Sequence, residues 1–209
     1  KKFNINESIS IKNTDVSDVL KVDNHLLIGT PFGLLKYDTN YLDISNQRQP
    51  SNSKWELLDY TNGLYDNAIW KIVKYKENAL VMTSNGINEI NLETFAVVDN
   101  TYEKFASNVI YDIEVLDGEI IYTCSDNLDK YFRLDICSRE CSDECIKNNI
   151  SELLVSTNKG LTRFNLRTNL ESFINNRRCY EIEIKDGFLY CLDEGILRKD
   201  LFNDTEDFE

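Results

Sequence analysis

The sequence lacks the features that would place it in several large protein classes. No apolar run approaches the roughly 18 residues of a bilayer-spanning helix, so the sequence predicts no membrane segment. No Walker A loop and no G-x-G-x-x-G segment occurs, and these are the motifs that hold nucleotide phosphates. There is one histidine, His25, and no G-x-S-x-G segment, so no activated nucleophile beside a base is indicated. We therefore predict a protein that is not an enzyme and carries no cofactor.

Positive charge is also scarce, and it is unevenly spread. The chain has 23 Lys and Arg against 36 Asp and Glu, a net charge of −13, which disfavours binding to free DNA. Residues 130–199 carry 12 basic against 11 acidic residues, whereas the other 139 residues carry 11 against 25. Solvated loops and strand faces would explain this asymmetry, and a contact surface for an anionic partner would explain it too, because guanidinium groups bind phosphate and carboxylate. For the contact surface, the predicted partner-binding residues are Arg163, Arg167, Arg177, Arg178 and Arg198.

All six cysteines lie in the second half of the chain. The N-terminal residues lack the apolar stretch of a secretory signal, so we predict reduced thiols and a cytoplasmic location. Cys137, Cys141 and Cys145 are spaced C-x₃-C-x₃-C, which makes them weak candidates for a zinc site with Cys124 as fourth ligand. Inert thiols are the alternative, and at these three cysteines we predict neither a disulfide nor a bound metal.

A repeated unit is the most informative feature of the sequence. Each copy has an apolar strand of about four residues, a short polar break, and a second strand that ends in Asp or Asn, which predicts a β-hairpin. The five copies are LLIGTPFGLLKYD (26–38), LVMTSNGINEIN (80–91), IIYTCSDNLDKYFRLD (120–135), LLVSTNKGLTRFN (153–165) and FLYCLDEGILRKD (188–200). Gly33, Gly86, Gly160 and Gly195 open the second strand, where glycine permits the positive φ of a turn or a close approach of strands.

Further strands extend these hairpins to about four strands per unit. Strands are predicted before four of the hairpins, at 18–24, 69–78, 109–118 and 179–187, and after several hairpins, at 55–60, 95–100 and 170–175. Blades of four strands and about 40–45 residues are typical of β-propellers. We predict one all-β domain over residues 1–209, a compact propeller of about five short blades. Its units are 16–60, 66–101, 107–141, 145–176 and 179–200, and the pattern fails only in 136–149.

A propeller closes by pairing its first and last blades, which removes the exposed sheet edges. Residues 8–11 (SISI) alternate polar and apolar side chains as a strand does. We predict that this segment completes the last blade beside residues 195–200.

The hairpin, glycine and final Asp or Asn together resemble the WD40-like propellers, over nearly the whole chain. The Trp of the family's Trp-Asp pair is replaced in every unit, and its Gly-His pair is absent. The family's hydrogen-bond network therefore cannot be carried over. A second resemblance is local. Residues 60–91, with a Gly-Leu turn, a strand and a later T-x-x-G segment, look like the repeat of the sensor propellers of bacterial two-component regulators.

The predicted function is a platform that docks onto protein or ribonucleoprotein assemblies, the ribosome included, without contact to membrane or free DNA. One alternative is the ligand-sensing domain of a larger regulator, which residues 60–91 favour. Another is an enzyme that uses the propeller channel, for which the sequence offers little. Trp55 and Trp70 are expected to pack within strands, and the alternative is that they are exposed on a rim and anchor a partner.

Overall fold

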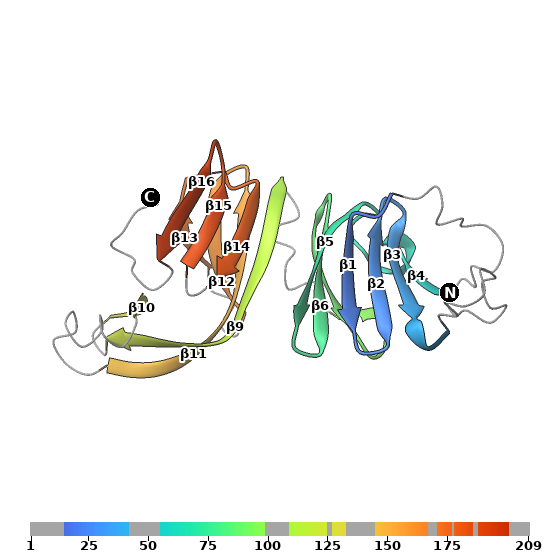
Figure 1. The fold of residues 1–209 in the computed structure, drawn as a ribbon, viewed down its shortest axis with the longest axis horizontal. Coiled ribbons are helices and arrows are strands. Elements are labelled where there is room, and N and C mark those ends of the chain that lie inside the picture. Colours follow the sequence, from blue (N-terminus) through green and yellow to red (C-terminus); the bar gives the residue numbers. More distant parts are fainter. Residues whose placement is uncertain are drawn as a thin grey trace. The chain divides into compact units, whose positions relative to one another are not determined.

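The computed structural model describes residues 15–41, 55–98, 109–124, 127–132, 145–166, 171–176, 178–185 and 188–200; between 117 and 150 it describes the backbone alone. The described residues form four sheets in which all paired strands are antiparallel. The prediction of an all-β protein is thereby confirmed. The chain divides into two compact units, residues 1–109 and 110–209, with two sheets in each (Figure 1). The prediction of a single domain stays a prediction. Among the described residues no helix is long and apolar enough to span a membrane.

The first unit contains two four-stranded sheets whose strands follow the order of the chain. The first sheet has the order β1-β2-β3-β4, and its strands are Asp18–Val22, His25–Thr30, Gly33–Asp38 and Trp55–Leu58. The second has the order β5-β6-β7-β8, and its strands are Ile69–Tyr75, Asn78–Thr83, Gly86–Asn91 and Ala96–Val97. Two short 3₁₀ turns, η2 (Thr39–Tyr41) and η3 (Tyr60–Asn62), follow β3 and β4. These sheets match the predicted units 16–60 and 66–101.

The second unit contains a five-stranded and a three-stranded sheet. The larger sheet has the order β10-β9-β11-β12-β13. Its strands are β9 (Ile110–Cys124), β10 (Asn127–Phe132), β11 (Cys145–Thr157), β12 (Gly160–Asn165) and β13 (Glu171–Asn175). The smaller sheet has the order β14-β15-β16, and its strands are Glu181–Lys185, Phe188–Leu192 and Ile196–Asp200. The smaller sheet corresponds to the predicted unit 179–200.

The larger sheet differs from the prediction, because it joins the expected units 107–141 and 145–176. We expected a turn near Gly118, but β9 continues through this position to Cys124 and pairs with β11 along most of its length, with register shifts. The 13 residues of β11 contain neither glycine nor proline, so nothing in that strand interrupts the ladder opposite β9. The described strands therefore form four sheets where five blades were expected. The expected closing strand, residues 8–11, lies outside the described residues.

Three of the predicted hairpins turn in the same way, on a threonine and a glycine. The hydroxyls of Thr30, Thr83 and Thr157 donate to the carbonyls of the glycines three residues later, at 2.8, 2.9 and 3.2 Å. Each hydroxyl also accepts from the backbone N–H two residues after it, at 3.1–3.2 Å. The three glycines have φ of +136°, +140° and +123°, a region that side chains rarely adopt. The expected role of these glycines is confirmed, and it explains why the motif T-x-x-G recurs.

Replacing Gly33 by alanine is expected to lower the free energy of unfolding by about 2 kcal/mol or more, through backbone strain and steric conflict. A Cβ at Gly33 would lie 2.5 Å from the carbonyl oxygen of Leu58, and φ is +136°. The matched control is Gly195→Ala, because a Cβ there meets nothing within 4 Å and φ is ordinary. Urea unfolding of both variants checks this. Equal stability of the two variants would contradict the assignment.

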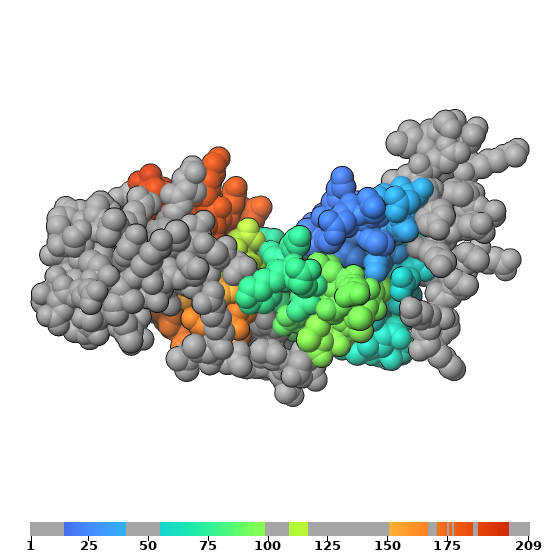
Figure 2. Space-filling model, turned by 90° about the horizontal axis from the view of Figure 1, so that it is seen from below, coloured from blue at the N-terminus to red at the C-terminus, as the bar shows by residue number. Residues whose placement is uncertain are grey.

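Each unit has one hydrophobic core that both of its sheets share. In the first unit the core joins strands β2 to β7, and its buried members are Leu27, Leu34, Leu58, Leu64, Ile69, Ile72, Ala79, Val81, Ile90 and Phe95. In the second unit they are Leu116, Leu154, Leu161, Cys179, Ile182, Leu189 and Cys191. Figure 2 shows residues 15–41, in blue, and 55–98, in cyan to green, packed into one continuous body. A pair of sheets is therefore the smallest part of this fold that encloses a core.

Candidate functional site

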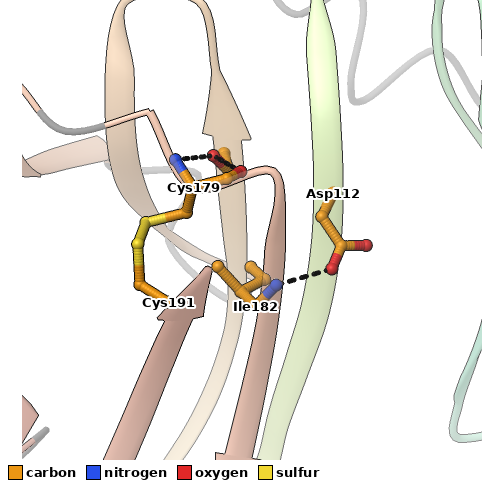
Figure 3. The surroundings of a disulfide bond; sticks show 5 residues. Asp112, Cys179, Ile182 and Cys191 are labelled. Atoms are coloured by element: carbon orange, nitrogen blue, oxygen red, sulfur yellow. Dashed lines mark hydrogen bonds between the residues drawn. A yellow bond between two sulfur atoms is a disulfide. The ribbon is translucent and has the colours of Figure 1, made fainter. Parts of the chain in front are cut away.

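An aspartate side chain links the two sheets in each unit, and sequence reasoning missed both aspartates. In the first unit Asp18 Oδ2 accepts from the backbone N–H of Ile72 at 2.7 Å, across from β1 to β5. In the second unit Asp112 Oδ2 accepts from the N–H of Ile182 at 2.8 Å, across from β9 to β14 (Figure 3). The other carboxylate oxygen of each accepts from the residue that follows it, at 2.7 and 2.9 Å. The same hydrogen-bonded link between two sheets thus occurs twice, at aspartates 94 residues apart in the sequence.

Replacing Asp112 by alanine is expected to lower the free energy of unfolding by about 1.5–3 kcal/mol, because a hydrogen bond to a charged group is lost and the Ile182 N–H loses its acceptor in the core. Asp112→Asn keeps one acceptor oxygen and is expected to lose less. Asp193→Ala, which removes a half-buried carboxylate elsewhere in the unit, is the control. Chemical denaturation measures all three. A cost for Asp112→Ala no larger than that of the control would contradict the bridge.

The second unit contains a buried disulfide between Cys179 and Cys191, with 5.2 Å between the Cα atoms (Figure 3). The segment that carries Cys179 is also tied to β11. Ser156 Oγ donates to the carbonyl of Cys179 at 2.5 Å and accepts from its N–H at 3.1 Å. The disulfide therefore connects β15 to a segment that the larger sheet already holds.

This disulfide corrects the prediction of reduced thiols and a cytoplasmic location, which was wrong. Disulfides persist in oxidising compartments and are rare in the cytosol, where thiol reductants open them. The prediction of reduced thiols rested on the absence of an apolar leader. That absence does not show which cysteines the fold brings together, and the fold places the Cα atoms of Cys179 and Cys191 5.2 Å apart. The part of the chain that the structure describes is thus built for an oxidising compartment.

The structure describes only part of the weak metal candidate. Cys137 and Cys141 lie outside the described residues, and Cys145 begins β11, where Cys124 is its Cα partner in the ladder. The side chains whose positions are described include no group of three metal-ligating residues. The expectation of neither disulfide nor metal at Cys137, Cys141 and Cys145 stays a prediction.

The predicted arginine surface is divided between different environments. Arg163 is buried in β12, and its Nε lies 3.2 Å from Glu152 Oε2, so its guanidinium forms an ion pair inside the sheet. Arg178 is exposed, and Arg198 is exposed with its guanidinium 4.7 Å from the ring centre of Phe188. Arg167 and Arg177 lie outside the described residues. Of the two predicted arginines that lie in strands, Arg163 and Arg198, only Arg198 is exposed. Partner binding by the exposed arginines stays a prediction.

The connection between the two sheets of the first unit lies against one hairpin turn of each sheet, the turns after β2 and after β6. Asn85, in the turn after β6, donates to Asp66 at 3.2 Å, and Ser84 N donates to the carbonyl of Ala68 at 3.1 Å. A Cβ built on Gly33, in the turn after β2, would lie 3.4 Å from Asp59 Cβ. The two turns and the connection therefore meet at one end of the unit. We call residues 15–18, 29–33, 58–70 and 83–86 the turn-end surface.

Three aromatic side chains of this surface are exposed. Phe32 is 59%, Tyr60 64% and Trp70 56% exposed, and the indole Nε1 of Trp70 donates to Ser84 Oγ at 2.9 Å. The expectation that Trp70 packs within a sheet is therefore wrong, and its exposed alternative holds. Trp55 is half-buried against Tyr37, with 4.4 Å between the ring centres. Periodicity could not separate the two tryptophans, because both lie in strands.

The backbone beneath these aromatics is held in place by side-chain hydrogen bonds. Asn88, fully buried in β7, accepts from Tyr65 N at 2.9 Å and donates to the carbonyl of Gly63 at 3.3 Å. Asp59 caps η3 by accepting from Thr61 N at 2.8 Å. Such bonds fix the connection between the sheets in one conformation, so the exposed rings are presented on a pre-organised support.

No protein-family model matches the chain, and no curated protein sequence matches it. Solved structures give weaker similarities. The chain is 17% identical to an extracellular domain from B. thetaiotaomicron described as part of a hybrid two-component system, with a TM-score of 0.48, covering 93% of this chain and 29% of that one. A second extracellular domain from B. thetaiotaomicron, described as part of a one-component system, is 16% identical with a TM-score of 0.46. That match covers 91% of this chain and 28% of the other. The AfRom2 CNH domain is 11% identical with a TM-score of 0.36, and that match covers 95% of this chain and 71% of the other.

The chain thus spans less than a third of the length of the first two structures. TM-scores below 0.5 do not establish a shared fold.

Proposed function

We propose that the chain is a ligand-binding part of a larger sensor protein, that it works in an oxidising compartment, and that its turn-end surface binds the ligand. The observation that carries this proposal is the grouping of Phe32, Tyr60 and Trp70 at one end of a unit whose other large apolar side chains, where the structure describes them, are mostly buried. Aromatic rings exposed together cost hydration free energy, and in folded proteins they commonly serve as anchors for a ligand or partner.

Two further observations support a sensor rather than a cytosolic scaffold. Residues 60–91, which resemble the repeat of two-component sensor propellers, supply Tyr60, Trp70 and the turn at Ser84 to the turn-end surface. The disulfide Cys179–Cys191 is unsuited to the reducing cytosol in which ribosomes work. The ribosome-associated platform therefore has no support in the structure. The proposal includes no catalysis, in keeping with the sequence prediction.

Ligand-dependent stability of the whole oxidised chain tests this function. Thermal unfolding is measured with millimolar sugars, amino acids, short peptides and nucleotides. A ligand present at about 100 times its dissociation constant stabilises by about 2.7 kcal/mol, a shift of roughly 5–10 °C for a protein of this size. Hydrogen exchange then locates the bound ligand. Protection at 30–33 and 59–70 is the expected result, and protection confined to the opposite strand ends would contradict the proposal.

A further inference from the structure

The charge of the turn-end surface is of one sign. Its described residues include four aspartates and no lysine, arginine or histidine, and the next charged residue along β5 is Lys71. The aspartates are Asp15, Asp18, Asp59 and Asp66, of which Asp15 is exposed and the other three are half-buried. At the opposite strand ends of the same unit the signs are mixed, with Lys74, Lys76 and Glu77 exposed. Among the described residues, the aromatic end of the unit is therefore also an acidic end without a basic side chain.

Hydrogen bonds hold the half-buried carboxylates of this surface in position. Asp59 Oδ1 accepts from Thr61 Oγ1 at 2.6 Å in addition to Thr61 N. Asp66 accepts from Ala68 N at 3.0 Å and from Asn85 at 3.2 Å. A carboxylate has about four lone-pair sites, so each of these two retains acceptor capacity for a ligand. Fixed negative groups beside exposed rings lose little conformational entropy when a cation binds.

We infer that the turn-end surface binds an extended peptide segment that carries lysine or arginine side chains. This rests on the proposed function and names the ligand class of the same surface. Basic side chains fit both features at once, because their aliphatic stems cover apolar rings, their cationic heads interact favourably with aromatic faces, and they pair with carboxylates. Three exposed rings and several carboxylates suit a chain with repeated basic groups better than a single small cation.

Charge also excludes the competing occupants. Nucleic acid and anionic membranes would meet an acidic surface on a chain of net charge −13. A second copy that docked through its own turn-end surface would bring like charge to like charge, which costs several kcal/mol across an interface. A basic peptide is the macromolecular ligand whose charge complements this end of the unit.

The fluorescence of Trp70 reports binding directly. The chain has two tryptophans, so Trp55→Phe leaves Trp70 as the only one, and its indole lies on the turn-end surface. The probes are eight-residue peptides of alternating Lys and Gly, Gln and Gly, or Glu and Gly, added to the full oxidised chain. We expect a saturable change with the lysine peptide, at least about ten-fold tighter than with the other two and weaker in added salt.

Matched variants separate local charge from net charge. Asp59→Asn with Asp66→Asn is expected to weaken lysine-peptide binding at least about five-fold. The control, Asp23→Asn with Glu77→Gln, removes the same charge from exposed positions at the opposite strand ends and is expected to change binding less than two-fold. Tyr60→Ser should also weaken binding, whereas Phe173→Ser, an equally exposed ring in the other unit, should not.

The inference is overturned if the lysine peptide binds no better than the glutamine peptide, or if the control pair weakens it as much as the turn-end pair. An uncharged ligand that protects the turn-end surface, with no preference for basic peptides, would overturn the inference and leave the proposed function standing. Peptide binding that changes Trp70 fluorescence but is weakened in neither the turn-end pair nor Tyr60→Ser would overturn the inference and leave the proposed function standing.

Discussion

Replacing Arg163 by leucine is expected to lower the free energy of unfolding by about 3–5 kcal/mol, the largest effect that the structure predicts for one residue. The guanidinium Nε lies 3.2 Å from Glu152 Oε2, and the two side chains are 7% and 1% exposed. Removing the arginine leaves a carboxylate inside a sheet with its main counter-charge gone. Equilibrium urea unfolding measures the loss.

The double variant Arg163→Leu with Glu152→Leu is the informative control. Replacing both members of a buried ion pair by apolar residues is often neutral or stabilising, so the double variant is expected to recover most of the loss. A single variant that costs less than about 1 kcal/mol, or a double variant that costs the sum of both singles, would contradict a coupled pair. The same experiment separates the two roles considered for Arg163, because a partner-binding arginine would alter binding and leave stability unchanged.

Removing the disulfide is the second large effect. The variant Cys179→Ala with Cys191→Ala is expected to lose about 2–4 kcal/mol, because the bond closes a loop with a sequence separation of 12 and a loop near this length restricts the unfolded chain by about 3 kcal/mol. Both sulfurs are also fully buried in the core of the second unit, so their removal leaves unfilled volume.

Reducing agent added to the unaltered chain distinguishes these two contributions, since it opens the bond and keeps both side chains. We expect the reduced chain to lose stability, and the alanine variant to lose somewhat more. The midpoint of thermal unfolding should then fall by roughly 6–12 °C for a protein of this size. A reduced chain as stable as the oxidised one would show that the bond has no structural role.

The hairpins could be predicted from sequence because their determinants are local. The need for a glycine three residues after a threonine is set by the geometry of one turn alone. Gly33, Gly86 and Gly160 therefore indicated the turns correctly. Gly118 has no threonine three residues before it and was expected to end the strand 109–118, but β9 continues past it because β11 supplies a long uninterrupted partner. Whether a glycine ends a strand depends on the strand opposite, and that information is not local.

The residues that join sheets were not predictable for the same reason. Asp18 and Asp112 are ordinary polar residues in alternating strands, and their importance lies in backbone N–H groups 54 and 70 residues away. Cys179 and Cys191 were predicted to be reduced thiols, because sequence spacing does not show which thiols meet.

Of the candidate site, the sequence indicated one member and one segment. Trp70 was named with exposure as the alternative, and residues 60–91 were singled out by their resemblance to sensor repeats. The grouping of Phe32, Tyr60 and Trp70 was not foreseeable, since it depends on a connection that packs against turns from two different sheets. Tyr37 is an aromatic residue of the same unit that is buried and does not belong to the exposed group. Its ring packs on Trp55, and burial, followed by the Asp38 carboxylate, raises the pKa of its phenol.

The central claim is that this chain is a recognition module that operates outside the reducing cytosol, and the redox state of Cys179 and Cys191 in the source cell tests it most directly. Thiols are blocked with an alkylating reagent at the moment of lysis, and the peptides are analysed by mass spectrometry without reduction. We predict recovery of the two cysteines as one linked peptide pair that takes up the reagent only after reduction. Alkylation of both cysteines before any reductant is added would contradict the account.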